Sequence, residues 1–221
     1  MRILGETNEK LPSFPNSAIP MNYLAHAYLS FDQDEVLVGN FIGDFVKGKM
    51  MGSFPQGVQN GIKLHRAIDL FTDTHPLVRA GQSYLRPKFG HYSTVITDIY
   101  FDYFLARNWA KFSSIPLEEF IQHTFSTISK YRQLFPDRFA TMFQWMVQDN
   151  WLLKYREIQG IQQTLTGMSR RTRFDSKMDE AHLALIEKET EFEVIFFAFF
   201  EDLETFAREK LIELQDSNAG H

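Results

Sequence analysis

Two acidic residues lie inside a strongly apolar stretch and limit the folds that this chain can adopt. Asp98 and Asp102 are four residues apart in the segment ITDIYFDYFLARNW, so on a helix they share one face. Little of such a helix can face water, and two buried carboxylates one turn apart repel each other unless they are protonated, paired or metal-bound. The sequence therefore predicts a helical core that contains a polar site.

A second group of polar residues precedes this stretch, in the segment GIKLHRAIDLFTDTHP. Its members His65, Asp69 and Asp73 follow one another at intervals of four and form a stripe on a helix. His26 and Asp44 lie in two further apolar segments nearer the N-terminus. Imidazole and carboxylate ligands together suit manganese, iron or zinc better than calcium. These residues predict a metal site built from several helices, although spacing alone establishes only pairs.

Each of these residues also has a structural interpretation. A histidine such as His26 in an apolar helix is commonly a core residue that bonds a backbone carbonyl, and Asp44 can be paired with a neighbouring basic side chain. Asp73 fits an exposed helix face with a charge pair, and His75 precedes a proline, where it can cap the end of a helix. Asp98 and Asp102 fit the structural interpretation least well.

Periodicity predicts an all-α protein that folds as a single-domain compact helical bundle, because long helical patterns follow one another and no strand pattern competes with them. Residues 1–20 contain three prolines and no periodic pattern, so we expect a disordered N-terminal extension, a helical domain over residues 21–214 and a disordered tail over 215–221. Helices are expected over residues 21–30, 36–46, 61–74, 77–85, 93–111, 117–131, 136–150, 151–165 and 179–214. Residues 47–59 and 167–174 are expected to be loops.

Composition excludes several classes of protein. The absence of cysteine (Cys 0) excludes disulfides, thiolate nucleophiles, zinc fingers and iron–sulfur clusters. A net charge of -5 gives no support for nucleic-acid binding, and no apolar run reaches the length of a membrane span. No P-loop, dinucleotide fingerprint or nucleophilic serine elbow is present.

Charge is unevenly distributed along the chain. Residues 47–111 carry nine Lys or Arg against four Asp, whereas residues 175–221 carry thirteen Asp or Glu against four Lys or Arg. If the four acids are occupied internally, the surface around the candidate site is basic and suits a phosphate-bearing or acidic partner. The residues expected to meet this partner are Lys47, Lys49, Lys63, Arg86 and Lys88, and the alternative for about half of the basic residues is a solubilising surface role.

Four ordered blocks resemble a known family. NYLAH (residues 22–26), GNFIGDFVKG (39–48), LHRAID with FTD (64–73) and DIYFDYFLARNW (98–109) are similar to the acyl carrier protein phosphodiesterase family, and the resemblance covers about residues 21–211. The family pattern often has histidine directly after the second aspartate of the last block, where this chain has Tyr103.

The resemblance implies a cytoplasmic, metal-dependent phosphodiesterase with an HD-like phosphohydrolase architecture. Such enzymes cleave the phosphodiester between 4′-phosphopantetheine and a serine of holo-acyl carrier protein, and release apo-carrier protein. The metal implied is manganese (Mn²⁺), with Fe²⁺ or Zn²⁺ as alternatives. The ligand set hypothesised from the residues and the resemblance together is His26, Asp44, His65, Asp69, Asp98 and Asp102, for one or two ions.

The remaining catalytic roles are assigned in the same way. Asp69 or Asp73 would orient the attacking water as general base, and Arg66 would hold the phosphate. Two alternatives stay open, a metal-dependent phosphohydrolase of another small phosphodiester or nucleotide and a non-catalytic helical protein that docks on the acidic carrier. We expect neither nucleic-acid nor membrane partners, and the sequence leaves the oligomeric state open.

Overall fold

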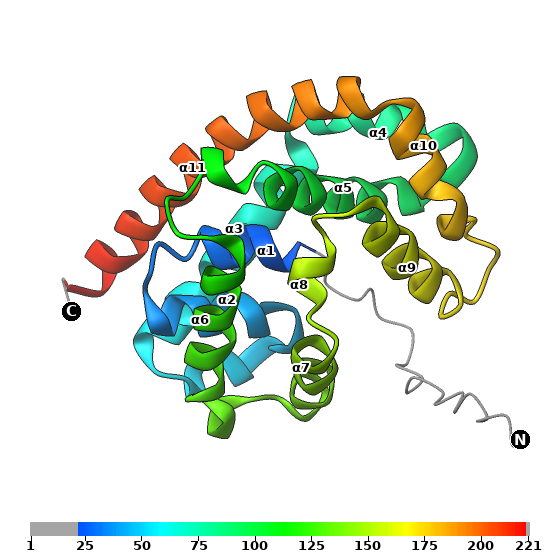
Figure 1. The fold of residues 1–221 in the computed structure, drawn as a ribbon. Coiled ribbons are helices and arrows are strands. Elements are labelled where there is room, and N and C mark those ends of the chain that lie inside the picture. Colours follow the sequence, from blue (N-terminus) through cyan, green and yellow to red (C-terminus); the bar gives the residue numbers. More distant parts are fainter. Residues whose placement is uncertain (1–21, 220–221) are drawn as a thin grey trace, which may run out of the picture.

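A computed structural model describes residues 22–219, so the extension expected over residues 1–20 lies outside the described residues (Figure 1). The described residues form α-helices and short 3-10 helices, with no β-strand among them, which confirms the all-α prediction. They build one compact unit around a continuous apolar core. Along this part of the chain, no helix combines the length and the apolar character needed to cross a bilayer.

The α-helices follow one another with short connections. Their bounds are α1 (Tyr23–Tyr28), α2 (Asp34–Ile42), α3 (Gln56–Thr74), α4 (Pro76–Phe89), α5 (Ser93–Arg107), α6 (Leu117–Ser129), α7 (Asp137–Gln148), α8 (Trp151–Lys154), α9 (Ile158–Ser169), α10 (Ala181–Glu187) and α11 (Glu189–Ala219). Short 3-10 helices lie between several of them, including η1 (Gly43–Phe45) and η2 (Gly48–Ser53) between α2 and α3.

Helices α2 and α3 cross in direct backbone contact. A Cβ atom on Gly39 would lie 2.2 Å from the carbonyl oxygen of Val58, and one on Gly61 would lie 2.2 Å from that of Val36. The two glycines face each other, so the crossing needs a hydrogen atom on both sides. This close approach fixes the position of α3, the helix that carries His65 and Asp69.

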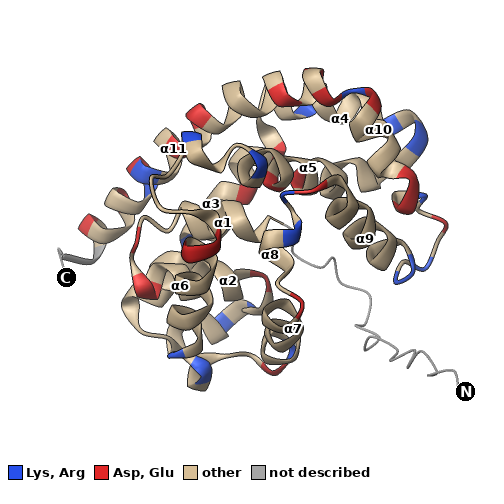
Figure 2. Cartoon of the chain, in the orientation of Figure 1, with Lys and Arg blue, Asp and Glu red and all other residues tan. Residues whose placement is uncertain are grey.

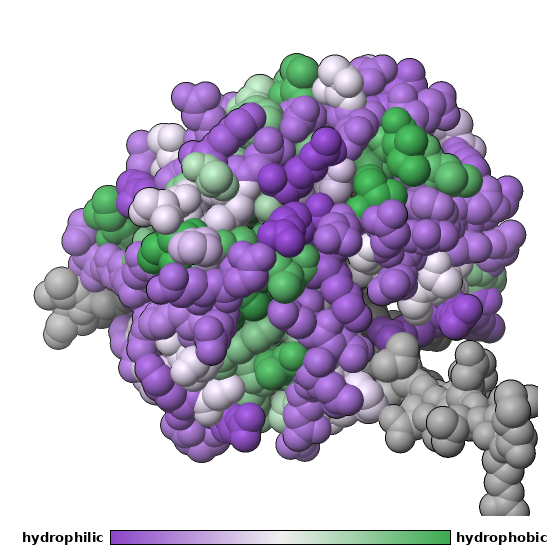
Figure 3. Space-filling view, viewed as in Figure 1, coloured by the Kyte–Doolittle hydropathy of each residue, from purple (hydrophilic) through white to green (hydrophobic). Residues whose placement is uncertain are grey.

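The long helix α11 covers one side of the molecule and packs against α3, α4 and α5 (Figure 1). Phe192, Phe196 and Phe199 form the buried stripe of this helix, at the spacing expected of a helix that lies on a core. Its other faces carry the acidic residues that the sequence concentrates near the C-terminus (Figure 2). In the view of Figure 3 the surface is mainly hydrophilic, with separate hydrophobic patches.

Several helix ends differ from the sequence prediction. Helix α3 begins at Gln56 rather than at residue 61, directly after Pro55, whose fixed φ suits a helix start. The helix expected over residues 151–165 is divided into α8 and α9, because the start of α9 turns back onto the end of α8, where a Cβ on Gly160 would lie 1.9 Å from the carbonyl oxygen of Lys154. The helix expected over residues 179–214 is divided at Lys188 into α10 and α11.

The C-terminal end also differs from the prediction. Helix α11 continues to Ala219, so a disordered tail that starts at residue 215 is wrong for residues 215–219. Leu214 packs against the apolar core, and the side-chain amide of Gln215 donates to Oε1 of Gln33 over 2.7 Å. These contacts extend the helix beyond the last residue of its buried stripe.

Candidate metal centre

Four of the predicted site residues converge from three elements. His26 lies on α1, Asp44 on η1, and His65 and Asp69 lie one turn apart on α3. Nε2 of His65 is 3.2 Å from Oδ2 of Asp69 and 3.3 Å from Oδ2 of Asp44. Nε2 of His26 is 3.2 Å from Oδ1 of Asp69. Folding therefore brings His26, His65 and Asp69 together, with Asp44 against His65.

The hydrogen bonds of Asn40 fix the tautomer of His26. Nδ2 of Asn40 donates to the carbonyl oxygen of His26 over 3.2 Å and to Oγ of Ser30 over 2.8 Å, so the amide oxygen is the atom that faces the ring. This oxygen lies 3.3 Å from Nδ1 of His26 and can only accept, so Nδ1 carries the proton. Burial lowers the pKa of His26, and the charge of His65 lowers it further, which favours the neutral ring.

In the neutral tautomer of His26, Nε2 has a lone pair and no proton. That lone pair faces the carboxylate of Asp69, which also offers only lone pairs. A cation between the two groups converts this repulsion into attraction. An imidazole held at one nitrogen by a side-chain amide, with the other nitrogen bare, is the arrangement of metal-ligating histidines in proteins.

His65 gives a second, independent sign of a cation site. Its Nε2 is buried and makes no well-formed hydrogen bond with any described group, although two carboxylates lie within 3.3 Å. Burial alone would lower the pKa of His65, but the nearby carboxylates of Asp44 and Asp69 outweigh it and raise the pKa. The same two carboxylates would stabilise a divalent cation at this point.

The histidines also change the pKa of Asp69. Burial alone would raise it, but the two neighbouring histidines and the hydrogen bond from Asn22 lower it to about 2. Asp69 is therefore ionised, and an ionised carboxylate is the form that binds a metal ion.

The packing behind the histidines makes the site rigid. The rings of His26 and His65 stack with centroids 4.2 Å apart, and their side chains are 1% and 2% exposed. Gly43 lies directly against His65, because a Cβ at this position would be 2.5 Å from the ring. The carboxylates are more open, at 40% exposed for Asp44 and 38% for Asp69. The site therefore has an imidazole floor and a carboxylate rim that solvent can reach.

The donor set fits a divalent metal ion. Among the described residues, His26, His65 and Asp69 each offer a ligand atom within 4.8 Å of the others, and Asp44 contacts His65 directly. Two imidazole nitrogens with carboxylate oxygens are typical of zinc, iron and manganese sites. The orphaned Nε2 of His65 and the bare Nε2 of His26 are the observations on which this assignment rests.

Asp98 lies close enough to this centre to be affected by its charges. Burial raises the pKa of Asp98 well above its usual value, and the charges of Asp69, Asp73, Asp102 and Asp44 raise it further. In the described part of the chain, its carboxylate has neither a hydrogen-bond partner nor an ion-pair partner. A positive charge near Asp98 would relieve this repulsion.

The structure places Asp102 differently from the sequence hypothesis. Its Oδ2 accepts a hydrogen bond from the backbone N–H of Leu24 over 3.1 Å, and its Oδ1 accepts one from that of Ala25 over 3.0 Å. Burial raises the pKa of Asp102 to about 8, and the two N–H donors act against this rise. Both oxygens cap the first turn of α1, whose own residues supply no side-chain cap. Asp102 thus holds the helix that carries His26.

The residues proposed to handle the proton and the phosphate flank the centre on α3. Asp73 lies one turn beyond Asp69; burial and the charge of Asp69 raise its pKa, while Arg79 lowers it. Nη2 of Arg66 donates to the carbonyl oxygen of Val46 over 2.7 Å, which ties α3 to the segment that follows Asp44. A guanidinium has five N–H donors, so the others remain for a ligand.

The five basic residues expected to contact a partner differ in exposure and in the groups that they contact. Lys47 and Lys49 are exposed just after η1, and Lys63 is partly buried on α3, one turn from Arg66. Lys88 is paired with Glu180, with 2.7 Å between Nζ and Oε2. Arg86 lines a pocket on the other side of the centre.

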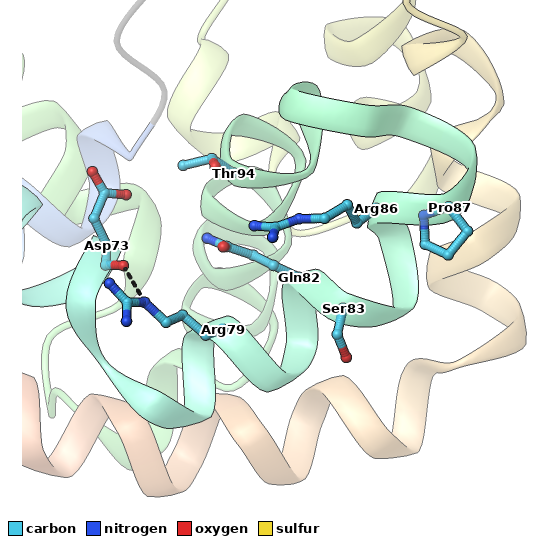
Figure 4. Close-up of a pocket in the computed structure, with 7 residues that line it drawn as sticks. All are labelled: Asp73, Arg79, Gln82, Ser83, Arg86, Pro87 and Thr94. Carbon is cyan, nitrogen blue, oxygen red and sulfur yellow. Dashed lines mark hydrogen bonds between the residues drawn. The ribbon is translucent and has the colours of Figure 1, made fainter.

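This pocket lies between the end of α3, α4 and the start of α5 and has a volume of about 740 Å³ (Figure 4). Its lining is mostly polar or charged and includes Asp73, one turn from Asp69 on α3. The other residues that line it are Arg79, Gln82, Ser83, Arg86, Pro87 and Thr94.

Comparison with known proteins gives a consistent result. Residues 21–203 match the family model described as acyl carrier protein phosphodiesterase. The chain is 37% identical to an acyl carrier protein phosphodiesterase from Enterobacter sp. (strain 638), over 72% of this chain and 83% of the relative. It is 36% identical to one from Escherichia coli O157:H7, over 76% and 90%, and 32% identical to one from Yersinia pestis, over 87% and 100%.

The chain belongs to the acyl carrier protein phosphodiesterase family. Its name describes hydrolases that act on a phosphodiester, and the match confirms the resemblance seen in the sequence blocks. No solved structure matches the chain, so the fold has no experimental counterpart among these comparisons.

In this member of the acyl carrier protein phosphodiesterase family, Tyr103 has a structural task. Its hydroxyl donates to Oε1 of Glu189 over 2.6 Å, at the first residue of α11, and Arg107 joins the same pair. Tyr103 therefore ties α5 to α11 and lies outside the group of His26, His65 and Asp69.

Sequence reasoning missed two functional residues. Asn40 selects the tautomer of His26, and Gly43 leaves the space that the His65 ring occupies. Asn40 could have been noticed as a polar residue inside the apolar segment VLVGNFI. In the structure Asn40 is 0% exposed. No sequence signal distinguished Gly43 from Gly39, because both lie on the strip where another element approaches closely.

Proposed function

We propose that this protein hydrolyses the phosphodiester that joins 4′-phosphopantetheine to a serine of holo-acyl carrier protein. The products are apo-acyl carrier protein and 4′-phosphopantetheine. Family membership supports the substrate and the reaction type. The observation that carries the mechanism is the convergence of His26, His65 and Asp69 within 4.8 Å, with a buried imidazole nitrogen that lacks a hydrogen bond.

We propose that a divalent metal ion is held by His26, His65, Asp69 and Asp44. When bound, such an ion neutralises phosphodiester oxygens and makes a bound water nucleophilic near neutral pH. Manganese is our first choice, and iron or zinc would suit the same donors. The half-exposed carboxylates lie at the side from which a phosphodiester can approach, while the buried histidines hold the site from below.

The unpartnered carboxylate of Asp98 is the fifth candidate ligand and would serve a second ion. Asp102 is left out of the proposed ligand set, because both of its oxygens already accept backbone hydrogen bonds. We also propose an HD-like architecture, because His and Asp side chains from several helices would surround one ion. His65 and Asp69 are four residues apart in this chain, so they do not form an adjacent His-Asp pair.

Proton transfer is assigned to Asp73. A carboxyl whose pKa is raised by burial and by a neighbouring acid is a better base than an ordinary aspartate, and Asp73 lies one turn from Asp69. The free N–H groups of Arg66 would bind a non-bridging phosphate oxygen, since guanidinium pairs well with phosphate. Asp44, Asp69, Arg66 and Asp73 are thus the proposed catalytic set.

The carrier protein is expected to dock on the side of Lys47, Lys49 and Lys63, which are near Asp44 and Arg66 and make no ion pair with a described acid. Acyl carrier proteins are acidic, so this basic surface offers charge complementarity and faster association. We also propose a cytoplasmic location, where the carrier substrate is expected to occur.

Incubation of the purified protein with holo-acyl carrier protein and Mn²⁺, followed by mass spectrometry, tests the proposal. We expect the carrier to lose the mass of 4′-phosphopantetheine. Asp44→Ala and Asp98→Asn should both reduce the rate by at least about 100-fold, the usual effect of removing a catalytic or metal-binding group. The matched control is Glu209→Gln, which removes an exposed acid on α11.

Three results would contradict parts of this proposal. Cleavage of small phosphodiesters with holo-carrier protein untouched favours a different substrate. Binding of the carrier without any cleavage favours the non-catalytic alternative. Full activity in both aspartate variants excludes the proposed metal centre, whatever the substrate.

A further inference from the structure

The pocket beside α4 lies one helical turn along α3 from the candidate metal centre. On α3, Asp69 belongs to the centre and Asp73, one turn further, lines the pocket. On α5, Thr94 lines the pocket one turn before Asp98. One helical turn advances about 5.4 Å, so a ligand with its phosphate at the centre reaches the pocket within a few bonds.

The floor of the pocket is a stripe of hydrogen-bonding side chains on α4. Arg79, Gln82 and Arg86 are spaced three and four residues apart and share one face of the helix. Figure 4 shows these three side chains pointing in the same direction, toward Asp73 and Thr94. The stripe therefore aims its polar ends toward Asp73, the lining residue one turn from Asp69.

Gln82 is the most informative of these residues. It is 4% exposed, and its side-chain amide has no hydrogen-bond partner among the described residues. Its amide atoms are not among the fully buried unpartnered atoms of the described residues, so water in the pocket can reach them, and a ligand bound there can replace that water. Because this amide offers both donors and an acceptor, it suits a ligand that itself contains amide groups.

We propose that this pocket binds the pantetheine arm of the substrate, an inference that rests on the proposed function. The arm is a narrow chain with two amides and a hydroxyl, attached to the scissile phosphate. Gln82 would pair with an amide of the arm, and the guanidiniums of Arg79 and Arg86 with its carbonyl oxygens. The pocket thereby distinguishes a phosphopantetheine diester from other diesters.

Shape favours the arm over the body of the carrier protein as occupant. A pocket of about 740 Å³, open to solvent along Arg79, Ser83 and Arg86, accommodates a slender chain, whereas a folded carrier needs a broad open surface. Such a surface exists at Lys47 and Lys49, which follow η1 in the chain and are outside this pocket. The two sides of the scissile phosphate would thus be bound on the two sides of the centre.

Competition kinetics with two inhibitors tests this assignment. Pantetheine has the arm without phosphate or carrier, and apo-acyl carrier protein has the carrier without the arm. In Gln82→Met and Arg86→Met we expect the inhibition constant of pantetheine and the KM for holo-carrier protein to rise about threefold to tenfold, the cost of a lost hydrogen bond. Inhibition by apo-carrier protein should stay as in the wild type.

The controls are Gln144→Met on α7 and Arg208→Met on α11, both exposed and away from the pocket, and thermal unfolding confirms that each variant is folded. Unchanged pantetheine inhibition in folded Gln82 and Arg86 variants overturns the assignment. If these variants weaken inhibition by apo-carrier protein as much as inhibition by pantetheine, the pocket binds the carrier and the arm assignment is wrong. A change in kcat without a change in KM also overturns the assignment. If the wild type does not cleave holo-carrier protein, the proposed function and the arm site both fail.

Discussion

Replacement of Asp102 by alanine tests whether this carboxylate is a helix cap or a metal ligand. In the structure it accepts hydrogen bonds from the backbone N–H groups of Leu24 and Ala25, which belong to the first turn of α1. Alanine removes both acceptors and leaves two buried donors without partners. The predicted effect is therefore on the stability of the fold, and only through it on the metal centre.

The magnitude follows from the number of orphaned donors. A buried polar group that loses its partner costs about 1–3 kcal/mol, so Asp102→Ala should lower the free energy of unfolding by about 2–6 kcal/mol. At about 2–4 °C per kcal/mol for a domain of this size, the Tm should fall by about 4–24 °C. Asp102→Asn keeps one acceptor oxygen and should lose about half as much.

The decisive assay is urea or thermal unfolding of the metal-free protein in a chelator. A cap stabilises α1 whether or not an ion is bound, so the loss should be the same with and without metal. A ligand would affect only the metal-loaded protein. If metal-free Asp102→Ala unfolds at the wild-type midpoint, the capping assignment is refuted.

Further predictions concern the residues around the metal centre. Gly43→Ala should displace the ring of His65, which lies 2.5 Å from the added Cβ position, and should weaken metal binding measured by calorimetry more than tenfold. Gly39→Ala should instead lower the free energy of unfolding by at least about 1–3 kcal/mol, because the added Cβ would be 2.2 Å from a backbone oxygen that cannot rotate away. Asn40→Leu should reduce metal affinity about 10–100-fold by releasing the tautomer of His26, and wild-type affinity in this variant would contradict that role. Addition of Mn²⁺ at 100 times its Kd should stabilise the wild type by about 2.7 kcal/mol, a shift that a chelator reverses and whose absence would exclude a metal site.

The sequence determined the helical class and the local pairs of site residues. Helical periodicity places residues four apart on one face, so the pairing of His65 with Asp69 followed directly from spacing, and the structure has it at 3.2 Å. The burial of Asp102 followed from its apolar neighbours in the same way, and the carboxylate is 0% exposed. The family blocks could also be recognised without coordinates.

Helix ends were less predictable, because tertiary contacts decide them. In the last turns of α11, Gln215 donates a hydrogen bond to Gln33, which is far away in the chain. The division of α8 from α9 depends on a close approach at Gly160 that no local pattern reveals. Propensity describes only the interior of such segments.

Only the tertiary structure decided which polar residues meet. Asp98 and Asp102 lie one turn apart among the same kind of apolar neighbours in the sequence. Asp102 nevertheless caps α1, whereas the pKa of Asp98 is raised by burial and by the charge of Asp69. The two carboxylates differ because different groups pack against them, and only Asp102 meets the backbone N–H groups at the start of α1. The approach of α1, η1 and α3 brings His26 and Asp44 to His65, and it depends on the glycine crossing of α2 and α3. Spacing fixes neighbours within one helix, whereas packing between helices chooses the partners that make a site.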